Sequence, residues 1–221
     1  MIRRGIGPSQ SERQSALFQM AHRSTTVSDT FTGVNGAGWD ATKWKATATS
    51  TTPTVDIQSN AARIQMTTGN YSWVYKDVNL GASRHFLMTC KLTPPAGEWY
   101  LVLNTRVSAR SPNLHELEAG YYLEISGSGI RISRFTNNAK EVLADVAKFA
   151  VGLTRVKAST IGQVSTLKIW PDAESEPVND DIVVVDPTPP KQPGTCGVQL
   201  YGGAAVTTYT AILDDFVVRT A

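Results

Sequence analysis

Carboxylates are the side chains of this 221-residue chain that could carry out hydrolysis. Glycoside hydrolysis needs two of them around one sugar bond, and alternate residues of a strand share a face about 7 Å apart. A strand with the pattern E-x-D-x-E would meet this need, but the sequence contains no such run. The closest pairs are Glu116 with Glu118 and Glu174 with Glu176, and both stand among turn-forming residues. We interpret them as solvated loop charges, so the sequence predicts a protein that is not an enzyme.

The metal-binding motifs of the chain are incomplete. The run HELEA at 115–119 has Ala119 where the zinc motif H-E-x-x-H needs a second histidine. With three histidines in all, and no G-x-S-x-G or phosphate-binding loop, no catalytic metal or cofactor is predicted. A structural calcium ion near Asp29 and Asp214 is one alternative, because pairing of the first and last strands would bring both carboxylates together. The other alternative is that these carboxylates accept backbone N–H bonds.

Three aromatic residues are the candidate carbohydrate-binding side chains. Sugar rings stack their apolar faces on tryptophan and tyrosine, whose polar groups also bond to hydroxyls. Tyr122, Trp170 and Tyr201 share strand parity with polar residues, which predicts that they point away from the core. They would then form an exposed platform for a glycan; the alternative is that loops cover them. Trp39 and Trp44 are expected to pin the first loop.

Residues from position 29 onward alternate between apolar and polar with a period of two, which is typical of strands. About ten to twelve short strands are expected, with hairpins at 120–135 and 154–170. Residues 137–150 fit either a helix or two short strands around Ala144. Strands with one apolar face need a second sheet to cover it, so the sequence predicts an all-β antiparallel sandwich.

Similar motifs stand at both ends of the predicted sandwich, DTF at 29–31 and DDF at 214–216. We expect the first and last strands to pair, which would bring Phe31 and Phe216 together. Cys90 and Cys196 alternate with apolar residues, so both are expected to be buried, unreactive thiols. A disulfide between them stays open.

Residues 1–28 are interpreted as an N-terminal arm in front of a domain at 29–221. The arm holds four arginines and Glu12, which gives it a charge of +3 and leaves −1 of the total of +2 for the domain. A nearly neutral domain argues against nucleic acid as a partner. No apolar run has the length of a membrane span or a secretion signal, so neither a membrane partner nor a Sec route is expected.

The arm contains one short helical pattern. Ser9 and Glu12 form a capping box, which predicts a helix that starts near residue 10. Leu17, Met20 and Ala21 share one face of this helix. Since so short a helix is marginal alone in water, we expect the stripe to dock on a neighbouring subunit. A frayed tail is the alternative.

The segment after residue 167 carries a family resemblance. Trp170-Pro171, an acidic turn and Glu176-Pro177 precede a valine-rich strand, a glycine-bearing strand and the DDF motif. With the opening DTF, this order resembles the concanavalin-A-like (laminin-G-like) jelly rolls in tail proteins of phages of actinobacteria, over residues 29–220. Related modules occur in bacterial sugar-binding and glycosidase-associated proteins.

The resemblance implies a structural virion protein of a bacteriophage, in the minor tail or on the particle surface, that contacts host cell-wall glycan. It implies a protein assembled in the host cytoplasm, attached to other virion proteins through residues 1–28, and homo-oligomeric. A stand-alone carbohydrate-binding module explains the sandwich and the aromatics but gives the arm no role. A glycoside hydrolase is the third alternative, and the missing carboxylate strand argues against it.

Overall fold

The computed structural model describes residues 25–45, 48–49, 53–68, 72–95, 99–110, 117–202 and 207–220. The predicted docking stripe of Leu17, Met20 and Ala21 lies outside these residues and stays a prediction. Strand β1 begins at Thr26, so the last residues assigned to the arm are part of the sheet.

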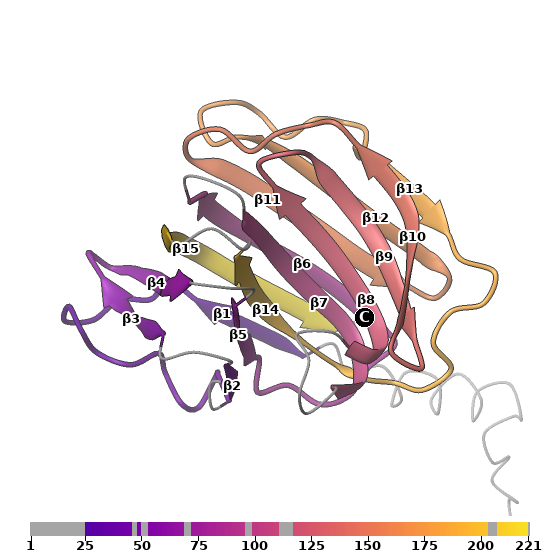
Figure 1. Ribbon diagram of the computed structural model, residues 1–221, viewed down its shortest axis with the longest axis horizontal. Helices are drawn as coiled ribbons and strands as arrows, with labels where there is room; N and C mark the ends of the chain where they lie inside the picture. The colour runs from indigo at the N-terminus through magenta and orange to yellow at the C-terminus, as the bar shows by residue number, and fades with distance from the viewer. Residues whose placement is uncertain are drawn as a thin grey trace, which may run out of the picture.

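The regular elements of the described residues are strands, which form two antiparallel sheets, and no helix among those residues could span a membrane. The eight-stranded sheet contains, in spatial order, β13 (Ile182–Val185), β12 (Val164–Pro171), β11 (Thr154–Ile161), β6 (His85–Thr93), β15 (Thr207–Thr220), β4 (Ala61–Thr68) and β3 (Thr54–Gln58), with β1 (Thr26–Asp29) paired to β15. The seven-stranded sheet contains β10 (Ala139–Val146), β9 (Ile130–Thr136), β8 (Leu117–Ser126), β7 (Trp99–Arg110), β14 (Thr195–Gly202), β5 (Ser72–Asp77) and β2 (Ala48–Thr49). The two sheets lie one over the other, with edge strands β10 and β13 on the same side (Figure 1). The predicted all-β sandwich is confirmed.

Strand β6 shows how the sequence alternation builds the core. Its inward residues Phe86, Met88, Cys90 and Leu92 are buried, whereas the residues between them are half-buried. They belong to one core cluster with inward leucines and isoleucines of the facing sheet. Burial of a leucine or phenylalanine side chain contributes about 1.5–3 kcal/mol, so each apolar face stabilises the other.

The two ends of the domain meet, as predicted. Strand β1 pairs with β15, and Asp29 stands opposite Phe216. The Trp44 ring contacts both end phenylalanines, with centroid distances of 5.8 Å to Phe31 and 4.9 Å to Phe216. Trp39 packs against Trp44 at 4.9 Å. The predicted pairing and the predicted role of both tryptophans are confirmed.

The region 137–150 differs from both of its predicted forms. It holds a single strand, β10, whose register with β9 is irregular between Val142 and Ala144. A helix is wrong here because Asn137 and Asn138 adopt φ angles of 51° and 63°, which suit a tight hairpin turn back onto β9. The two predicted hairpins, β8–β9 and β11–β12, are confirmed.

Both cysteines are free thiols buried in the core, Cys90 on β6 and Cys196 on β14. Burial raises the pKa of the Cys90 thiol to about 12 and raises that of Cys196 as well. The predicted burial is confirmed, and no disulfide joins the two sheets.

The loop at 172–181 folds back over the outer face of β11 and β12, where the outer face of a sheet is the side turned away from the core. Glu176 of this loop accepts from Lys157 and Lys168, with both N–O distances 2.8 Å. Lys168, which is 4% exposed, also donates to the carbonyl of Pro177 at 2.9 Å. Its ammonium lies 6.0 Å from the centroid of the buried Trp170 ring. The residues that carry the family resemblance therefore close this face of the sheet.

Candidate functional site

The outer face of the seven-stranded sheet holds buried polar side chains. The antiparallel register places Asn104 of β7 opposite Tyr122 of β8. Val102 of β7 stands between Glu124 of β8 and Gln199 of β14. We call Asn104, Tyr122, Glu124 and Gln199 the polar row, and none of them is more than 5% exposed. Side chains on this face point away from the main core, and a second, smaller buried cluster of Val102, Val107, Tyr122 and Phe135 packs beside the polar row.

Asn104 is the member of the polar row with unmet hydrogen-bonding capacity. It is fully buried, and neither atom of its side-chain amide has a hydrogen-bond partner among the described residues. An amide offers two donors and one acceptor, and about nine in ten buried polar groups in folded proteins are paired. Leaving such a group unpaired costs about 1–3 kcal/mol. The amide is therefore placed to bond to a hydroxyl group that no described residue supplies.

The other members of the row are held by neighbours. The two carboxylate oxygens of Glu124 accept from Lys140 at 2.6 Å and from Ser133 at 2.8 Å. The hydroxyl of Tyr122 donates to Oε1 of Gln199 at 3.1 Å. These bonds fix the side chains before any ligand arrives, which is the requirement for a precise binding site.

Tyrosines border the polar row on the same face. Tyr100 of β7 stands opposite Tyr201 of β14, and their ring centroids are 5.8 Å apart. Tyr75 of β5 stands opposite Gln199. All three tyrosines are half-buried. Partly exposed aromatic rings beside fixed polar groups can stack on the apolar face of a ligand and bond to its polar edge.

The structure brings two of the three predicted aromatics together. Tyr122 and Tyr201 share the outer face of the seven-stranded sheet, whereas Trp170 belongs to the other sheet. The predicted exposed platform is wrong for Tyr122 and Trp170, which are 3% and 7% exposed. The Tyr122 ring packs on Phe135 with a centroid distance of 4.5 Å, and the loop at 172–181 closes the face over Trp170. The alternative, that these rings are covered, holds for both.

Sequence reasoning did not single out Asn104. Its signal is its position in β7, where it follows Tyr100 and Val102 at alternate positions in a strand of mainly apolar residues. An asparagine there is unfavourable for a strand and is therefore informative.

The carboxylate pairs named from the sequence form no catalytic pair within the described residues. Glu116 lies outside those residues, and Glu118 falls in β8 where a loop was expected. Glu174 and Glu176 lie in the turn after β12, as expected, and are exposed. Glu176 is engaged by two lysines, as described above.

The carboxylates near the two ends of the domain, Asp29 and Asp214, accept hydrogen bonds from N–H groups. The carboxylate of Asp29 accepts from the backbone N–H of Phe31 at 2.9 Å and from the indole N–H of Trp44 at 2.8 Å. Asp214 accepts from the backbone N–H of Asp215 at 2.8 Å. This is the second of the two roles considered for them. Among the described residues, no group of three or more His, Cys, Asp or Glu side chains could hold a metal ion.

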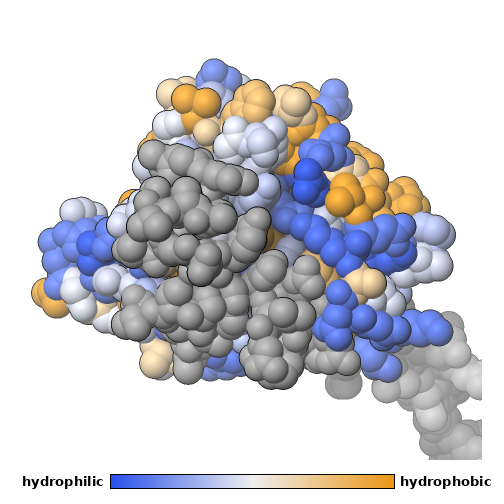
Figure 2. Space-filling view, in the orientation of Figure 1, coloured by the Kyte–Doolittle hydropathy of each residue, from blue (hydrophilic) through white to orange (hydrophobic). Residues whose placement is uncertain are grey.

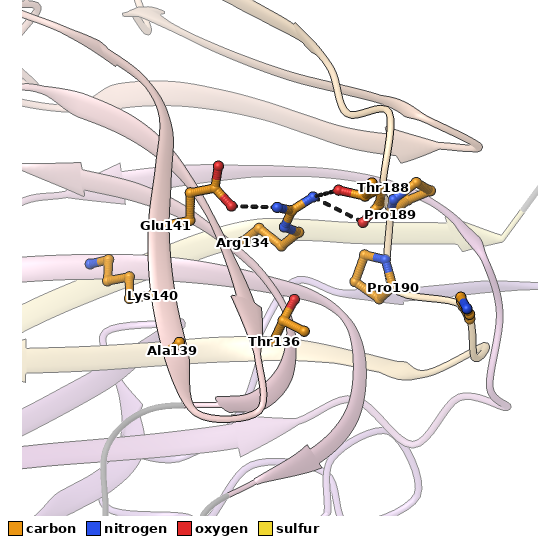
Figure 3. A pocket seen from close by; sticks show the side chains of 9 residues that line it. Arg134, Thr136, Ala139, Lys140, Glu141, Thr188, Pro189 and Pro190 are labelled. Carbon is orange, nitrogen blue, oxygen red and sulfur yellow. Dashed lines mark hydrogen bonds and ion pairs between the residues drawn. The ribbon is translucent and has the colours of Figure 1, made fainter.

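A hollow of about 400 Å³ lies beside the turn between β9 and β10 (Figure 3). Within it the Arg134 guanidinium is directed to Glu141 on one side and to Thr188 on the other. Arg134 also forms an ion pair of 2.5 Å with the buried Asp186, which accepts from the hydroxyl of Tyr121 at 2.7 Å. Because these partners occupy the guanidinium, Arg134 has a structural role: it ties the proline-rich segment 187–190 to the hairpin.

Solved structures of similar fold are jelly-roll sandwiches, which confirms the predicted fold class. A β-glucanase of Bacillus licheniformis matches with a TM-score of 0.59 and 12% identity, over 89% of this chain and 98% of that one. The carbohydrate-binding module CBM66 from Bacillus subtilis matches with a TM-score of 0.54 and 15% identity, over 79% and 94%. The CBM2 module of the evolved Dit of Lactobacillus casei BL23 phage J-1 matches with a TM-score of 0.53 and 8% identity, over 77% and 80%. No protein-family model and no curated protein sequence matches the chain.

Proposed function

We propose that the outer face of the seven-stranded sheet binds carbohydrate and that the domain is a glycan-binding module. The observation that carries this proposal is the enclosed amide of Asn104, which has no hydrogen-bond partner among the described residues and lies in a rigid polar row bordered by tyrosines. The similar structures include a protein titled as a carbohydrate-binding module and a phage module titled CBM2, which supports the same class.

A sugar ring would first contact the half-buried pair Tyr100 and Tyr201, whose rings stack on its C–H faces. Its hydroxyl groups would then bond to the polar row, and the amide of Asn104 would gain the partner that it lacks. Because Asn104 is fully enclosed, this last contact requires nearby side chains to move. Such rotamer changes at a binding surface are common even where the backbone stays in place.

We propose further that the module binds without hydrolysis. Glu124 is held by Ser133 and Lys140, as described above. The other described carboxylates on this face are Asp145 on β10 and Asp77 on β5, two and three strands away. These separations correspond to about 10 and 14 Å of sheet. Hydrolases place their two carboxyl groups about 5–5.5 Å apart when retaining and about 6.5–9.5 Å apart when inverting. Release of reducing sugar from cell-wall glycan would overturn this part of the proposal.

We also propose that the module is displayed on a phage particle, in the minor tail or on the surface. The Trp170–Pro177 motif and the similarity to the phage Dit module support this location. A stand-alone carbohydrate-binding module fits the fold and the site equally well. Mass spectrometry of purified particles, combined with imaging of a labelled domain, distinguishes the two: absence of the chain from particles leaves the stand-alone module.

Binding is tested by titrating the full chain with host cell-wall polysaccharides and defined oligosaccharides. Loss of one stacking ring removes about 1 kcal/mol, so Tyr201→Ala should weaken binding about fivefold, whereas Tyr201→Phe should keep most of it. Thr89→Ala, on the outer face of the other sheet, is the matched control and should bind like the parent chain. If no glycan binds, or if Tyr201→Ala and Thr89→Ala behave alike, the proposed site is wrong.

A further inference from the structure

The outer face of the eight-stranded sheet ends in a group of exposed apolar side chains. The register places Ile161 opposite Val164, and Val164 opposite Val185. Val183 lies two residues before Val185 on the same face of β13. These four residues, 48%, 37%, 66% and 60% exposed in the order named, are the valine patch. Isolated exposed apolar residues are common, but a contiguous group on one sheet face indicates a contact surface.

The valine patch borders a hollow of about 500 Å³. Leu87 and Ile161 line it from the sheet, and Pro177 and Val178 line it from the loop at 172–181. Val178 is 98% exposed, so one wall of the hollow presents a bare apolar side chain. Figure 2 also shows hydrophobic side chains at the margin of the sandwich where β10 and β13 lie. Polar side chains complete the lining, namely Lys157, Ser159, Thr166, Lys168, Glu176 and Asp180. The surface thus combines an apolar margin with polar groups, which suits a short amphipathic segment.

The chain enters the sandwich beside this surface. Thr26, the first residue of β1, stands opposite Arg219 of β15, and Arg219 stands opposite Leu87 of β6. From Leu87 the same row continues through β11 and β12 to Val183. The 24 residues that precede Thr25 therefore join the sheet at the end that carries the valine patch.

We propose that the N-terminal segment of residues 10–21 docks on the valine patch of its own chain through Leu17, Met20 and Ala21. The distance from β1 to Ile161 on β11 is three strand spacings, about 14 Å. Met20 lies five residues before Thr25, and a link that is helical to residue 22 and extended afterwards covers about 13 Å. The reach of the chain thus matches the position of the patch.

The reach and the apolar stripe of the segment select the occupant, and charge does not. Four acidic residues of the loop at 172–181 already pair with lysines or arginines outside the loop; they are Asp172, Glu176, Asp180 and Asp181. The stripe of Leu17, Met20 and Ala21 would instead bury the exposed apolar side chains of the patch. This contact differs from the neighbouring-subunit contact expected from the sequence, because the partner lies in the same chain.

The test is disulfide trapping in the full chain. Met20→Cys combined with Ile161→Cys should form an intramolecular disulfide under mild oxidation, seen as a reductant-sensitive mobility shift of the monomer and as a linked peptide by mass spectrometry. Met20→Cys combined with Thr136→Cys, on the other sheet, is the control and should not. The native thiols are buried and should not compete. A disulfide only between chains, no disulfide, or equal trapping in the control overturns the proposal.

A second measurement guards against misfolding of the cysteine variants. Leu17→Asp and Ile161→Asp should each lower the melting temperature of the full chain, and the double variant should lower it by no more than the larger single effect. Ile161 is half exposed, so its substitution leaves the core intact. Additive shifts in the double variant would show that the two residues do not touch and would overturn the proposal.

Discussion

Replacing Asn104 by leucine is expected to stabilise the ligand-free domain and to remove glycan binding at the same time. Leucine has the same branching and number of heavy atoms as asparagine in its side chain, and it has no group that needs a hydrogen bond. The amide of Asn104 is fully buried and has no partner in the part of the chain that the structure describes, which costs about 1–3 kcal/mol. Removing it should recover that free energy. Each kcal/mol shifts the melting temperature of a domain of this size by about 2–4 °C, so the variant should melt about 2–12 °C above the parent chain.

The assay is thermal and urea unfolding of the full chain without ligand, followed by glycan titration. Gln199→Leu on the same face is the matched control, since it removes the acceptor of the Tyr122 hydroxyl. Loss of this hydrogen bond lowers the free energy of unfolding by about 0.5–1.5 kcal/mol. The two variants should therefore shift stability in opposite directions and should both lose affinity. If Asn104→Leu is less stable than the parent chain by about 1 kcal/mol or more, its amide is paired in solution and the reasoning fails.

Three further predictions concern the fold. Trp44→Phe removes the hydrogen bond from the indole N–H to the Asp29 carboxylate. Because hydrogen bonds to charged groups contribute about 1.5–3 kcal/mol, urea unfolding should show a free energy of unfolding that is lower by at least about 1.5 kcal/mol. Glu176 has its pKa held below its ordinary value of 4.5 by hydrogen bonds from two lysines, so its contribution is present above that pH and is lost as the pH falls through the folded-state pKa. Glu176→Gln should thus lower the melting temperature at pH 7 by the equivalent of about 0.2–1 kcal/mol and should lower it less as the pH falls below 4.5; an equal effect at pH 7 and at acidic pH would exclude the ion pairs as its cause. Cys90 and Cys196 should resist thiol reagents at pH 8 until the chain is denatured, because burial raises both pKa values, and rapid labelling of either in the native state would contradict a closed core.

The parts of the fold that were predictable depend on local alternation and on matching ends. Phe86 and Leu92 point inward because alternate positions of a strand share a face, and the hairpins follow from turn residues between such strands. The approach of Phe31 to Phe216 followed from two similar motifs at the ends of one domain. These features need no knowledge of which strands are neighbours in the middle of each sheet.

The parts that were not predictable depend on what covers the second face of each sheet. Strand parity places Tyr122 and Trp170 away from the core, but it does not tell whether another segment encloses them, and the structure shows that both are buried. Asn104 acquires its significance only when the register sets it opposite Tyr122. The strand at 139–146 was ambiguous because its charged and apolar residues also fit a helix, and two asparagines at positive φ decide for the hairpin.

The residues that carry the family resemblance and the residues of the candidate site belong to different sheets. The residues that stabilise the fold are therefore not the residues that would contact a ligand. Trp170 and Glu176 hold the loop that closes the eight-stranded sheet, and the two end motifs pack around Trp44. None of these residues lies on the outer face of the seven-stranded sheet, where Asn104 and Tyr201 stand. Substitutions on that face leave every contact of the motif in place. Domains that share the motif can therefore differ in what they bind, and the ligand of this chain must be inferred from its polar row.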